Sequence, residues 1–195
     1  MEAKNALRKE LRARRNSHVA SLDPRIRALM FSRPPSPVTS LIADEATVAC
    51  YLAGPGEAPA AAYARFFHEA GHSVALPWFK DRASPMTFRQ WTTPWVEDDL
   101  VAGPWSGIKQ PAADAPEITP DVVFVPLVGF SSDGARLGQG GGHYDRWLAQ
   151  HPHTIAIGLA WDCQLVENLP CEAHDRPLRA VITPARIYGP WEAVS

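Results

Sequence analysis

The chain of 195 residues carries 19 Lys and Arg against 21 Asp and Glu, which gives a formal net charge of −2. This balance gives no case for a broad basic surface that binds nucleic acid or an acidic membrane, so any anion site must be local. The length suits one α/β core, and we expect a single domain over residues 1–195.

The cysteine pattern and the lack of long apolar runs both indicate in which cellular compartment the protein works. Three cysteines without CxxC or zinc-ligand spacing favour a reducing environment, and we expect core thiols at Cys50, Cys163 and Cys171. The first residues form no apolar signal core, and no segment approaches the roughly 18 apolar residues of a membrane span. The sequence therefore predicts a cytoplasmic protein, and we expect a monomer that acts on a small molecule.

The N-terminal segment predicts helices. Residues 4–19 lack Gly and Pro, and Leu7 and Leu11 share one helical face. The same spacing aligns four basic side chains in a stripe, Lys4, Arg8, Arg12 and Arg15. Such a stripe, taken alone, is more often a solvated face. A second helix is expected over residues 24–31, before the prolines of residues 34–37 break regular structure.

Strands and helices then alternate along the chain. Strands are expected at residues 47–52, 73–77, 121–127, 154–159 and 180–183, with helices at 58–70 and 144–152. Residues 80–107, rich in Trp and Pro, predict an irregular excursion. The alternation predicts an α/β fold with a doubly wound, mostly parallel sheet and helices on both faces, in three layers.

A glycine-rich loop follows the most apolar predicted strand. Residues 136–145 read Arg-Leu-Gly-Gln-Gly-Gly-Gly-His-Tyr-Asp. Glycines without Cβ let backbone N–H groups approach a polyphosphate, and the helix that follows adds its positive end. A Rossmann fingerprint needs Gly or Ala where His143 stands, and a Walker A loop needs Gly-Lys-Ser/Thr. The loop therefore predicts a different phosphate cradle, and a flexible connector is the less favoured alternative.

Asp145 falls in the first turn of the helix after this loop. The helix dipole alone is a sufficient reason for a carboxylate there. Beside a bound triphosphate the same carboxylate can hold Mg²⁺, which prefers one or two carboxylates plus phosphate oxygens. The spacing alone leaves both interpretations open.

Residues 125–146 resemble the signature of the 5-formyltetrahydrofolate cyclo-ligase family, and the likeness covers nearly the whole chain. Lys4 with Leu7 and Arg8 resembles the family's N-terminal element. The middle and C-terminal segments are similar through Pro77, Met86, Phe88 and Trp91, and through residues 158–162, Pro170, His174 and Asp175.

The resemblance implies an α/β enzyme that uses ATP and Mg²⁺. ATP would phosphorylate the formyl oxygen of 5-formyltetrahydrofolate, N10 would attack, and phosphate would leave to give 5,10-methenyltetrahydrofolate. A formyl oxygen is a poor leaving group, and phosphorylation converts it into a good one. A paralogue with the same ATP site but another substrate, and a non-catalytic folate-binding protein, are the alternatives.

The resemblance also assigns roles to individual residues. Lys4, Arg8 and Arg136 would be catalytic contacts to ATP phosphates. The rest of the nucleotide cradle would be Leu137, Gly138, Gln139, Gly140, Gly141, Gly142, His143 and Tyr144. Asp145 and Asp175 would bind Mg²⁺, and the substrate would meet Glu57, Tyr144 and Trp91.

Several of these positions also have ordinary explanations, and two depart from the family pattern. Without the resemblance, Glu57 would be interpreted as an ordinary surface carboxylate. Trp91 or Phe88 could provide a surface for the folate rings, but such side chains are more commonly buried in the core. His143 stands where many members have an aromatic residue, and Gln110 replaces a frequent glutamate. Neither departure removes a proposed phosphate or metal group.

Overall fold

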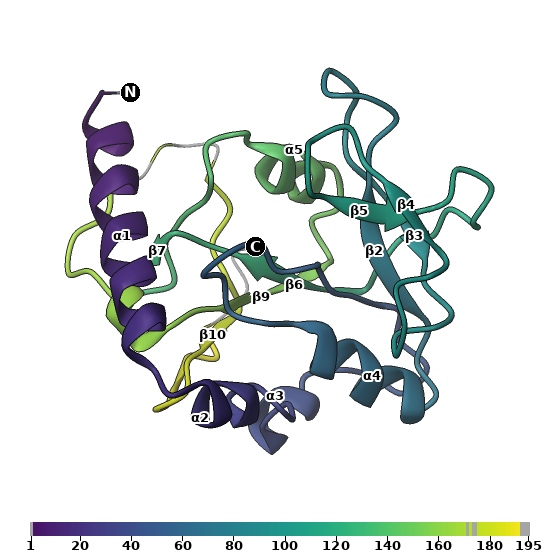
Figure 1. Ribbon diagram of the computed structural model, residues 1–195, viewed down its shortest axis with the longest axis horizontal. Coiled ribbons are helices and arrows are strands. Elements are labelled where there is room, and N and C mark those ends of the chain that lie inside the picture. The colour runs from purple at the N-terminus through teal and green to yellow at the C-terminus, as the bar shows by residue number, and fades with distance from the viewer. Residues whose placement is uncertain (1, 171, 173–174, 192–195) are drawn as a thin grey trace.

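The computed structural model describes residues 2–170, 172 and 175–191, and a mixed sheet lies at its centre (Figure 1). The strand order in this sheet is β11-β10-β9-β6-β1-β2-β3. Its strands are β1 (Val48–Ala49), β2 (Val74–Trp78), β3 (Thr87–Gln90), β6 (Val122–Pro126), β9 (Ile155–Leu159), β10 (Ala180–Ile182) and β11 (Ile187–Tyr188). The inner strands run parallel, and β3 and β11 pair antiparallel at the two edges. The predicted mostly parallel α/β sheet is confirmed.

Helices cover both faces of the sheet because its strands are apolar on both sides. Phe124 of β6 packs on α4 (Ala61–Glu69), where the ring centroids of Phe124 and Tyr63 lie 5.4 Å apart. Its neighbour Val123 joins the opposite cluster with Trp147 of α5 (His143–Gln150). The short helices α2 (Pro24–Leu29) and α3 (Ser36–Thr39) lie on the α4 side (Figure 1).

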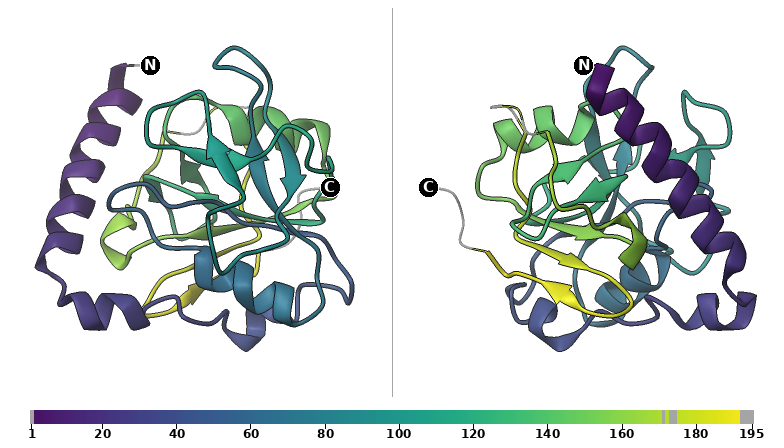
Figure 2. Two further views of the ribbon diagram at one scale, coloured as in Figure 1. Left: turned by 45° about the vertical axis from the view of Figure 1, so that its right-hand side comes forward. Right: turned by 90° about the vertical axis from the view of Figure 1, so that its left-hand side faces the viewer.

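The long helix α1 (Glu2–Ser21) lies along one flank of the molecule (Figure 2). Leu11 packs in a small apolar cluster with Val128 and Leu137. Val128 immediately precedes β7 (Gly129–Phe130), and Leu137 belongs to β8 (Arg136–Leu137), which pairs with β7 in a two-stranded sheet. A Cβ at Gly129 would lie 2.6 Å from Leu11 Cδ1, so only glycine permits this close approach. The packing holds the basic stripe of α1 beside the glycine loop.

The structure differs from the predicted elements where strands are short or lie at an edge. Residues 80–107 are not wholly irregular: they include β3 and also β4 (Leu100–Ala102), which pairs with β5 (Lys109–Pro111) in a hairpin. Half-polar strands of two to four residues carry too little periodicity to be read from sequence. Pro34 and Pro35 lie outside regular structure, as expected, but Pro37 does not break it, because it occupies the first turn of α3, where no N–H is needed.

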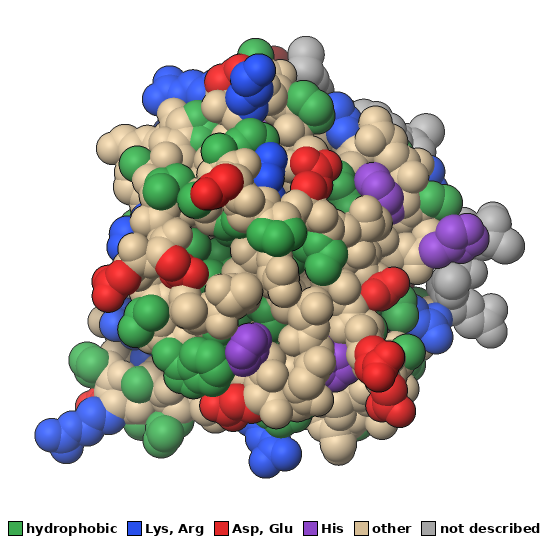
Figure 3. Space-filling model, turned by 90° about the vertical axis from the view of Figure 1, so that its right-hand side faces the viewer, with side chains coloured by type: hydrophobic (Ala, Val, Ile, Leu, Met, Phe, Trp, Pro, Cys, Tyr) green, Lys and Arg blue, Asp and Glu red, His purple; other side chains and the backbone are tan. Residues whose placement is uncertain are grey.

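Burial of the cysteines agrees in part with the prediction. Cys50 is buried in the core and Cys163 is half-buried, whereas Cys171 lies outside the described residues. On the face shown in Figure 3, acidic and basic side chains are interspersed among apolar ones, without a large patch of one sign. Within the described part of the chain, no helix combines the length and the apolar character needed to cross a membrane.

Candidate active site

A cavity of about 930 Å³ opens at the carboxyl ends of parallel strands β1, β2 and β6. This edge of an open parallel sheet is where ligands commonly bind. One wall is formed by α1, the glycine loop and the start of α5, and the opposite wall by residues 51–57, 76–79 and the β4–β5 hairpin. The cavity brings together every predicted site residue except Trp91.

The glycine loop bends back over the basic face of α1. Gly140 has a φ of +106° and Gly142 one of +64°, both in the left-handed region that favours glycine. Gly142 is the N-cap residue of α5, so the loop leads directly into a helix, as the sequence predicted. The Nε of Arg8 donates to the carbonyl oxygen of Gly138 at 3.0 Å. The loop therefore sets backbone groups and one guanidinium on the same wall.

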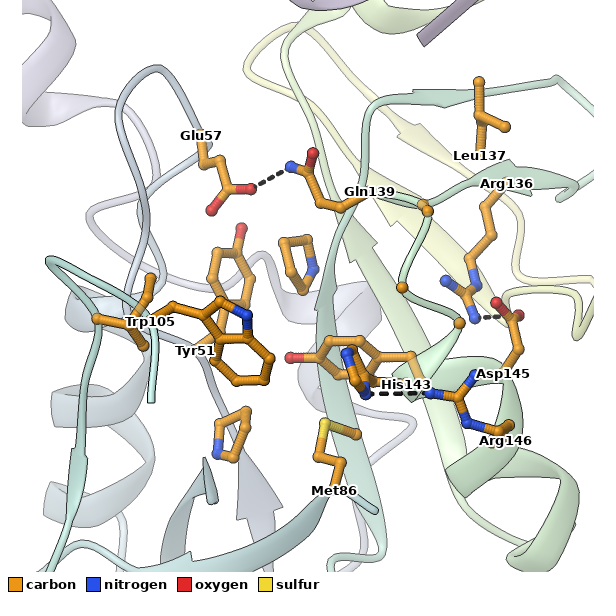
Figure 4. Close-up of a pocket in the computed structure, with 18 of the residues that line it drawn as sticks. Tyr51, Glu57, Met86, Trp105, Arg136, Leu137, Gln139, His143, Asp145 and Arg146 are labelled. Carbon is orange, nitrogen blue, oxygen red and sulfur yellow. Dashed lines mark hydrogen bonds and ion pairs between the residues drawn. The ribbon is translucent and has the colours of Figure 1, made fainter. Parts of the chain in front are cut away.

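A buried ion pair connects the two ends of the predicted loop. Arg136 is 7% exposed, and its Nη2 lies 2.5 Å from Oδ1 of Asp145, a contact drawn in Figure 4. Burial lowers the pKa of Arg136, and the carboxylates of Asp145 and Asp175 oppose this shift. A buried cation that keeps its charge through neighbouring carboxylates is a strong electrostatic element.

Lys4 makes a second ion pair in the same wall. Its Nζ lies 2.8 Å from Oδ2 of Asp175 and 3.2 Å from Oε2 of Glu172. Burial works against the charge on Lys4, but the hydrogen bonds to Asp175 and Glu172 raise its pKa above the ordinary value. Lys4 is therefore not part of a solvated helix face.

The two predicted metal ligands fit Mg²⁺ only together with a phosphate-bearing ligand. Asp145 contacts the guanidinium of Arg136, and the charges of Asp145 and Asp175 both raise the pKa of Arg136. Among the described residues there is no group of three or more His, Cys, Asp or Glu side chains that can hold a metal. Mg²⁺ needs fewer, because it keeps water and takes oxygens from nucleotide phosphates.

The wall opposite the loop is aromatic. Tyr51, Met86 and Trp105 lie on the side of the cavity opposite the loop, with His143 of α5 beside them (Figure 4). Phe79 and Tyr144 line the same cavity. The ring of Phe79 lies 4.7 Å from that of Trp105 and 4.9 Å from that of His143, both edge-on. His143 thus fills the place of an aromatic side chain. Burial and the Arg146 guanidinium lower its pKa.

Gln110, the second departure from the family pattern, holds the backbone of Phe79 in this wall. Its amide oxygen accepts from the Phe79 N–H at 3.1 Å, and its amide nitrogen donates to the Phe79 carbonyl at 2.9 Å. An ionised glutamate has no proton to donate to the carbonyl. The glutamine therefore satisfies both backbone groups of Phe79 and fixes the ring that contacts His143.

Glu57 lies at the mouth of the cavity. Its Oε2 accepts from the Gly54 N–H at 2.9 Å, and its Oε1 accepts from Nε2 of Gln139 at 2.5 Å. Nη1 of Arg15 lies 3.9 Å from the same Oε1. Glu57 is therefore a positioned carboxylate rather than an ordinary surface side chain.

The predicted contact between Trp91 and the substrate needs correction. Trp91 is 3% exposed and packs in the apolar cluster on the α4 face, where it does not line the cavity. Phe88, the alternative, is 1% exposed and packs on Trp147. Both are core side chains, the commoner fate of such residues. Tyr51, Phe79 and Trp105, which the sequence reasoning missed, line the cavity instead.

Three further residues named in the sequence analysis, Leu137, His174 and Arg12, differ in how they relate to the cavity. The side chain of Leu137 is 2% exposed and packs in the cluster with Leu11, so it offers the cavity little more than backbone. His174 lies outside the described residues. Arg12, which was predicted only as part of the basic stripe, contacts the loop by donating to Gln139.

The sequence profile of the 5-formyltetrahydrofolate cyclo-ligase family matches residues 1–184. The chain belongs to this family. A 5-formyltetrahydrofolate cyclo-ligase of Escherichia coli K12 is 48% identical over 87 residues, which are 42% of this chain and 48% of that relative. The relative from Mycolicibacterium smegmatis is 31% identical over 123 residues, 60% of this chain and 55% of its own length. The chain thus spans about half the length of these cyclo-ligases.

Two solved structures share the fold. One is a 5,10-methenyltetrahydrofolate synthetase from Mycoplasma pneumoniae, with a TM-score of 0.66 and 21% identity over 92% of this chain and 97% of that one. The other is the 5,10-methenyltetrahydrofolate synthetase of Aquifex aeolicus, with a TM-score of 0.66 and 22% identity over 98% and 95% of the two chains. At these identities the likeness concerns the cyclo-ligase fold alone.

Proposed function

We propose that this protein is an ATP- and Mg²⁺-dependent ligase that converts 5-formyltetrahydrofolate into 5,10-methenyltetrahydrofolate. The observation that carries the proposal is one cavity with two unlike walls. A cationic glycine-loop wall suits a nucleotide triphosphate, and an aromatic wall with a positioned carboxylate suits a folate. Membership of the cyclo-ligase family supports the same reaction.

The nucleotide half is rich in cations that lie close to one another. Burial, then the neighbouring Arg15 and Arg8 guanidinium groups, lower the pKa of Arg12. Mutual repulsion of this kind is relieved when a polyanion binds. Lys4, Arg8 and Arg136 would contact the ATP phosphates, and the loop from Gly138 to Tyr144 would supply backbone N–H groups.

Asp145 and Asp175 would hold Mg²⁺ beside those phosphates. When bound, the ion would neutralise charge on the transferred phosphoryl group. Each carboxylate accepts a backbone N–H bond, from Arg176 at 3.4 Å and from Glu172 at 2.8 Å respectively, and these bonds restrict how it turns. Arg136 and Lys4, which pair with Asp145 and Asp175 in this structure, would then also contact the phosphates.

The folate half would orient the reacting formyl group. Tyr51, Phe79, Trp105 and Tyr144 offer ring surfaces for the pterin and aminobenzoate rings. The Glu57 carboxylate can accept two N–H bonds from a pterin edge, a charge-assisted and directional contact. Burial raises the pKa of Tyr51 and Tyr144, so both hydroxyl groups stay neutral. The Tyr51 hydroxyl donates to the Ala58 carbonyl at 2.6 Å, which fixes this ring.

The chemistry then requires two displacements. The formyl oxygen takes the γ-phosphoryl group of ATP and ADP leaves. The N10 lone pair attacks the formyl carbon, the N10 proton is lost, and the carbon–oxygen bond breaks to release phosphate. Lys4, Arg8 and Arg136 would stabilise the negative charge that develops on the phosphoryl oxygens in both steps. The aromatic wall would exclude water, which would otherwise hydrolyse the phosphorylated species.

The test is to mix purified protein with 5-formyltetrahydrofolate, ATP and Mg²⁺ and to record the near-ultraviolet absorbance of the methenyl product together with released ADP. We expect both signals, and neither when ATP is omitted. A folded protein that gives no product would contradict the proposal. Turnover of ATP only with another small molecule would identify a paralogue, and folate binding without turnover would identify a binding protein. A single domain, a monomer and a cytoplasmic location stay predictions.

A further inference from the structure

Gln139 joins three separate elements of the site. Its amide oxygen accepts from Nε and Nη2 of Arg12 at 3.1 and 2.9 Å, and its backbone carbonyl accepts from the same Nη2 at 2.8 Å. Its amide nitrogen donates to Oε1 of Glu57 at 2.5 Å, across the mouth of the cavity (Figure 4). One side chain therefore ties α1 and the glycine loop to the turn that carries Glu57.

Three groups hold Glu57: the Gly54 N–H donates to Oε2, whereas Gln139 and Arg15 both act on Oε1, so the position of Oε1 depends on Gln139. Arg15 lies behind it, 5% exposed, and its Nε and Nη1 have no hydrogen-bond partner among the described residues. With Nη1 at 3.9 Å, this buried cation attracts the carboxylate toward the protein interior. The amide of Gln139 attracts the same Oε1 toward the loop. The balance of the two attractions fixes which lone pairs of the Glu57 carboxylate point into the cavity.

We propose that Gln139 is a positioning residue that couples nucleotide binding to substrate binding. The inference rests on the proposed function, because it takes the loop as the nucleotide half and Glu57 as a substrate contact. A nucleotide that orders the loop against Arg12 fixes Gln139, and Gln139 in turn fixes Glu57 in the orientation that accepts the substrate. By linkage, bound substrate favours the nucleotide by the same factor.

An amide is the group that this role requires. It accepts from a guanidinium with its oxygen and donates to a carboxylate with its nitrogen at the same time. Glutamate in its place would keep the Arg12 contact and repel Glu57, whereas lysine would keep the Glu57 contact and repel Arg12. Methionine, of similar length, would remove both side-chain contacts and leave only the backbone carbonyl bond to Arg12.

The coupling is measured as a ratio of dissociation constants. Calorimetric titration gives the dissociation constant of 5-formyltetrahydrofolate without nucleotide and with saturating Mg²⁺ and β,γ-imido-ATP, which does not transfer its phosphoryl group. In the unaltered protein we expect the nucleotide to tighten substrate binding about fivefold or more. In Gln139→Met and in Arg12→Met we expect the ratio to lie within about twofold of one.

Matched variants separate coupling from a merely structural role. Arg14→Met is the control, because Arg14 is exposed on α1 and donates to Leu165 instead of the loop, so its ratio should equal that of the unaltered protein. Gln139→Lys should restore affinity for the substrate alone, through Glu57, without restoring the ratio. A structural defect would weaken both ligands and leave the ratio unchanged.

Two outcomes separate this inference from the proposed function. Binding of both ligands with a ratio near one in the unaltered protein, or with an undiminished ratio in Gln139→Met, would overturn the coupling role alone. A folded protein that binds neither ligand would overturn the proposed function, and the coupling role with it.

Discussion

The two walls of the cavity are built in different ways. The charged groups of the cationic wall are already paired: Arg136 with Asp145 at the two ends of one loop, and Lys4 of α1 with Asp175 from the segment before β10. The aromatic wall is assembled from Tyr51, Phe79 and Trp105, which are far apart in the sequence. We infer that the first wall is preorganised to bind a charged ligand and the second to fit a flat aromatic one. Substitutions in one wall should therefore affect the use of the nucleotide, and substitutions in the other the use of the folate.

The largest effect is expected from Arg136→Met. The change would remove the cation proposed to contact the transferred phosphoryl group, and it leaves Asp145 without its ion-pair partner. Loss of one such electrostatic contact lowers kcat by about 10²- to 10³-fold. Initial rates of methenyl formation, measured with each ligand saturating, check this expectation. Arg14→Met serves as the control, and a kcat within twofold of normal for Arg136→Met would show that the buried cation is not part of the chemistry.

Asp145→Asn is expected to weaken Mg²⁺–ATP use and to leave folate binding largely intact. The amide keeps the size of the side chain but loses the negative charge that a hard cation prefers. We expect the Mg²⁺ concentration at half-maximal rate to rise by about tenfold or more. A Mg²⁺ titration of the rate, with calorimetric folate binding alongside, measures both quantities. Unchanged Mg²⁺ dependence would remove Asp145 from the metal site.

Trp105→Ala should act on the other wall. Loss of the indole surface is expected to raise the KM for 5-formyltetrahydrofolate about tenfold, with the KM for ATP within about twofold of normal. Steady-state kinetics with each substrate varied in turn provides the measurement. Equal changes in both KM values would contradict the division into two walls.

Trp91→Ala is the matched contrast, because this tryptophan is buried in the core. We expect it to lower the free energy of unfolding by about 3–5 kcal/mol, as large-to-small changes of buried aromatic side chains do. The fraction that stays folded should keep a normal KM for the folate. Urea unfolding and kinetics at low temperature test these two points. A raised KM for the folate in a variant of normal stability would show that Trp91 contributes to the site.

The smallest effect concerns His143, which packs on the aromatic wall. Its pKa is lowered from the ordinary value of 6.5 by burial and by Arg146, so below that pH the unfolded chain binds more protons than the folded one. The stability that comes from the neutral ring is present above pH 6.5 and is lost as the pH falls from 6.5 through the lowered pKa of the folded protein. His143→Phe should reduce this loss. Urea unfolding across the window checks it, and parallel curves for the two proteins would contradict it.

The same contrast between walls explains how far sequence could predict the site. The glycine loop, its preceding arginine and its following aspartate are contiguous, and helical spacing aligned Lys4 with Arg8, so these groups were found together. Buried parallel strands such as β6 were also predicted, because continuous apolar runs need no tertiary information.

The remainder depended on tertiary structure. Trp105 reaches the cavity because the β4–β5 hairpin folds over it, and Trp91, similar in type and surroundings, turns into the core instead. Sequence does not separate these two fates, because both residues lie in short, irregular or half-polar segments. Gln139 was assigned to the cradle, but its bonds to Arg12 and Glu57 join residues 127 and 82 positions away in the chain.

The central claim is that the two walls deliver a phosphoryl group from ATP to a formyl oxygen held opposite it. The most direct measurement uses 5-formyltetrahydrofolate labelled with ¹⁸O in the formyl group and follows the label by mass spectrometry. We predict that each phosphate released with the methenyl product carries one ¹⁸O atom. Unlabelled phosphate, with the ¹⁸O recovered in water, would contradict phosphorylation of the formyl oxygen.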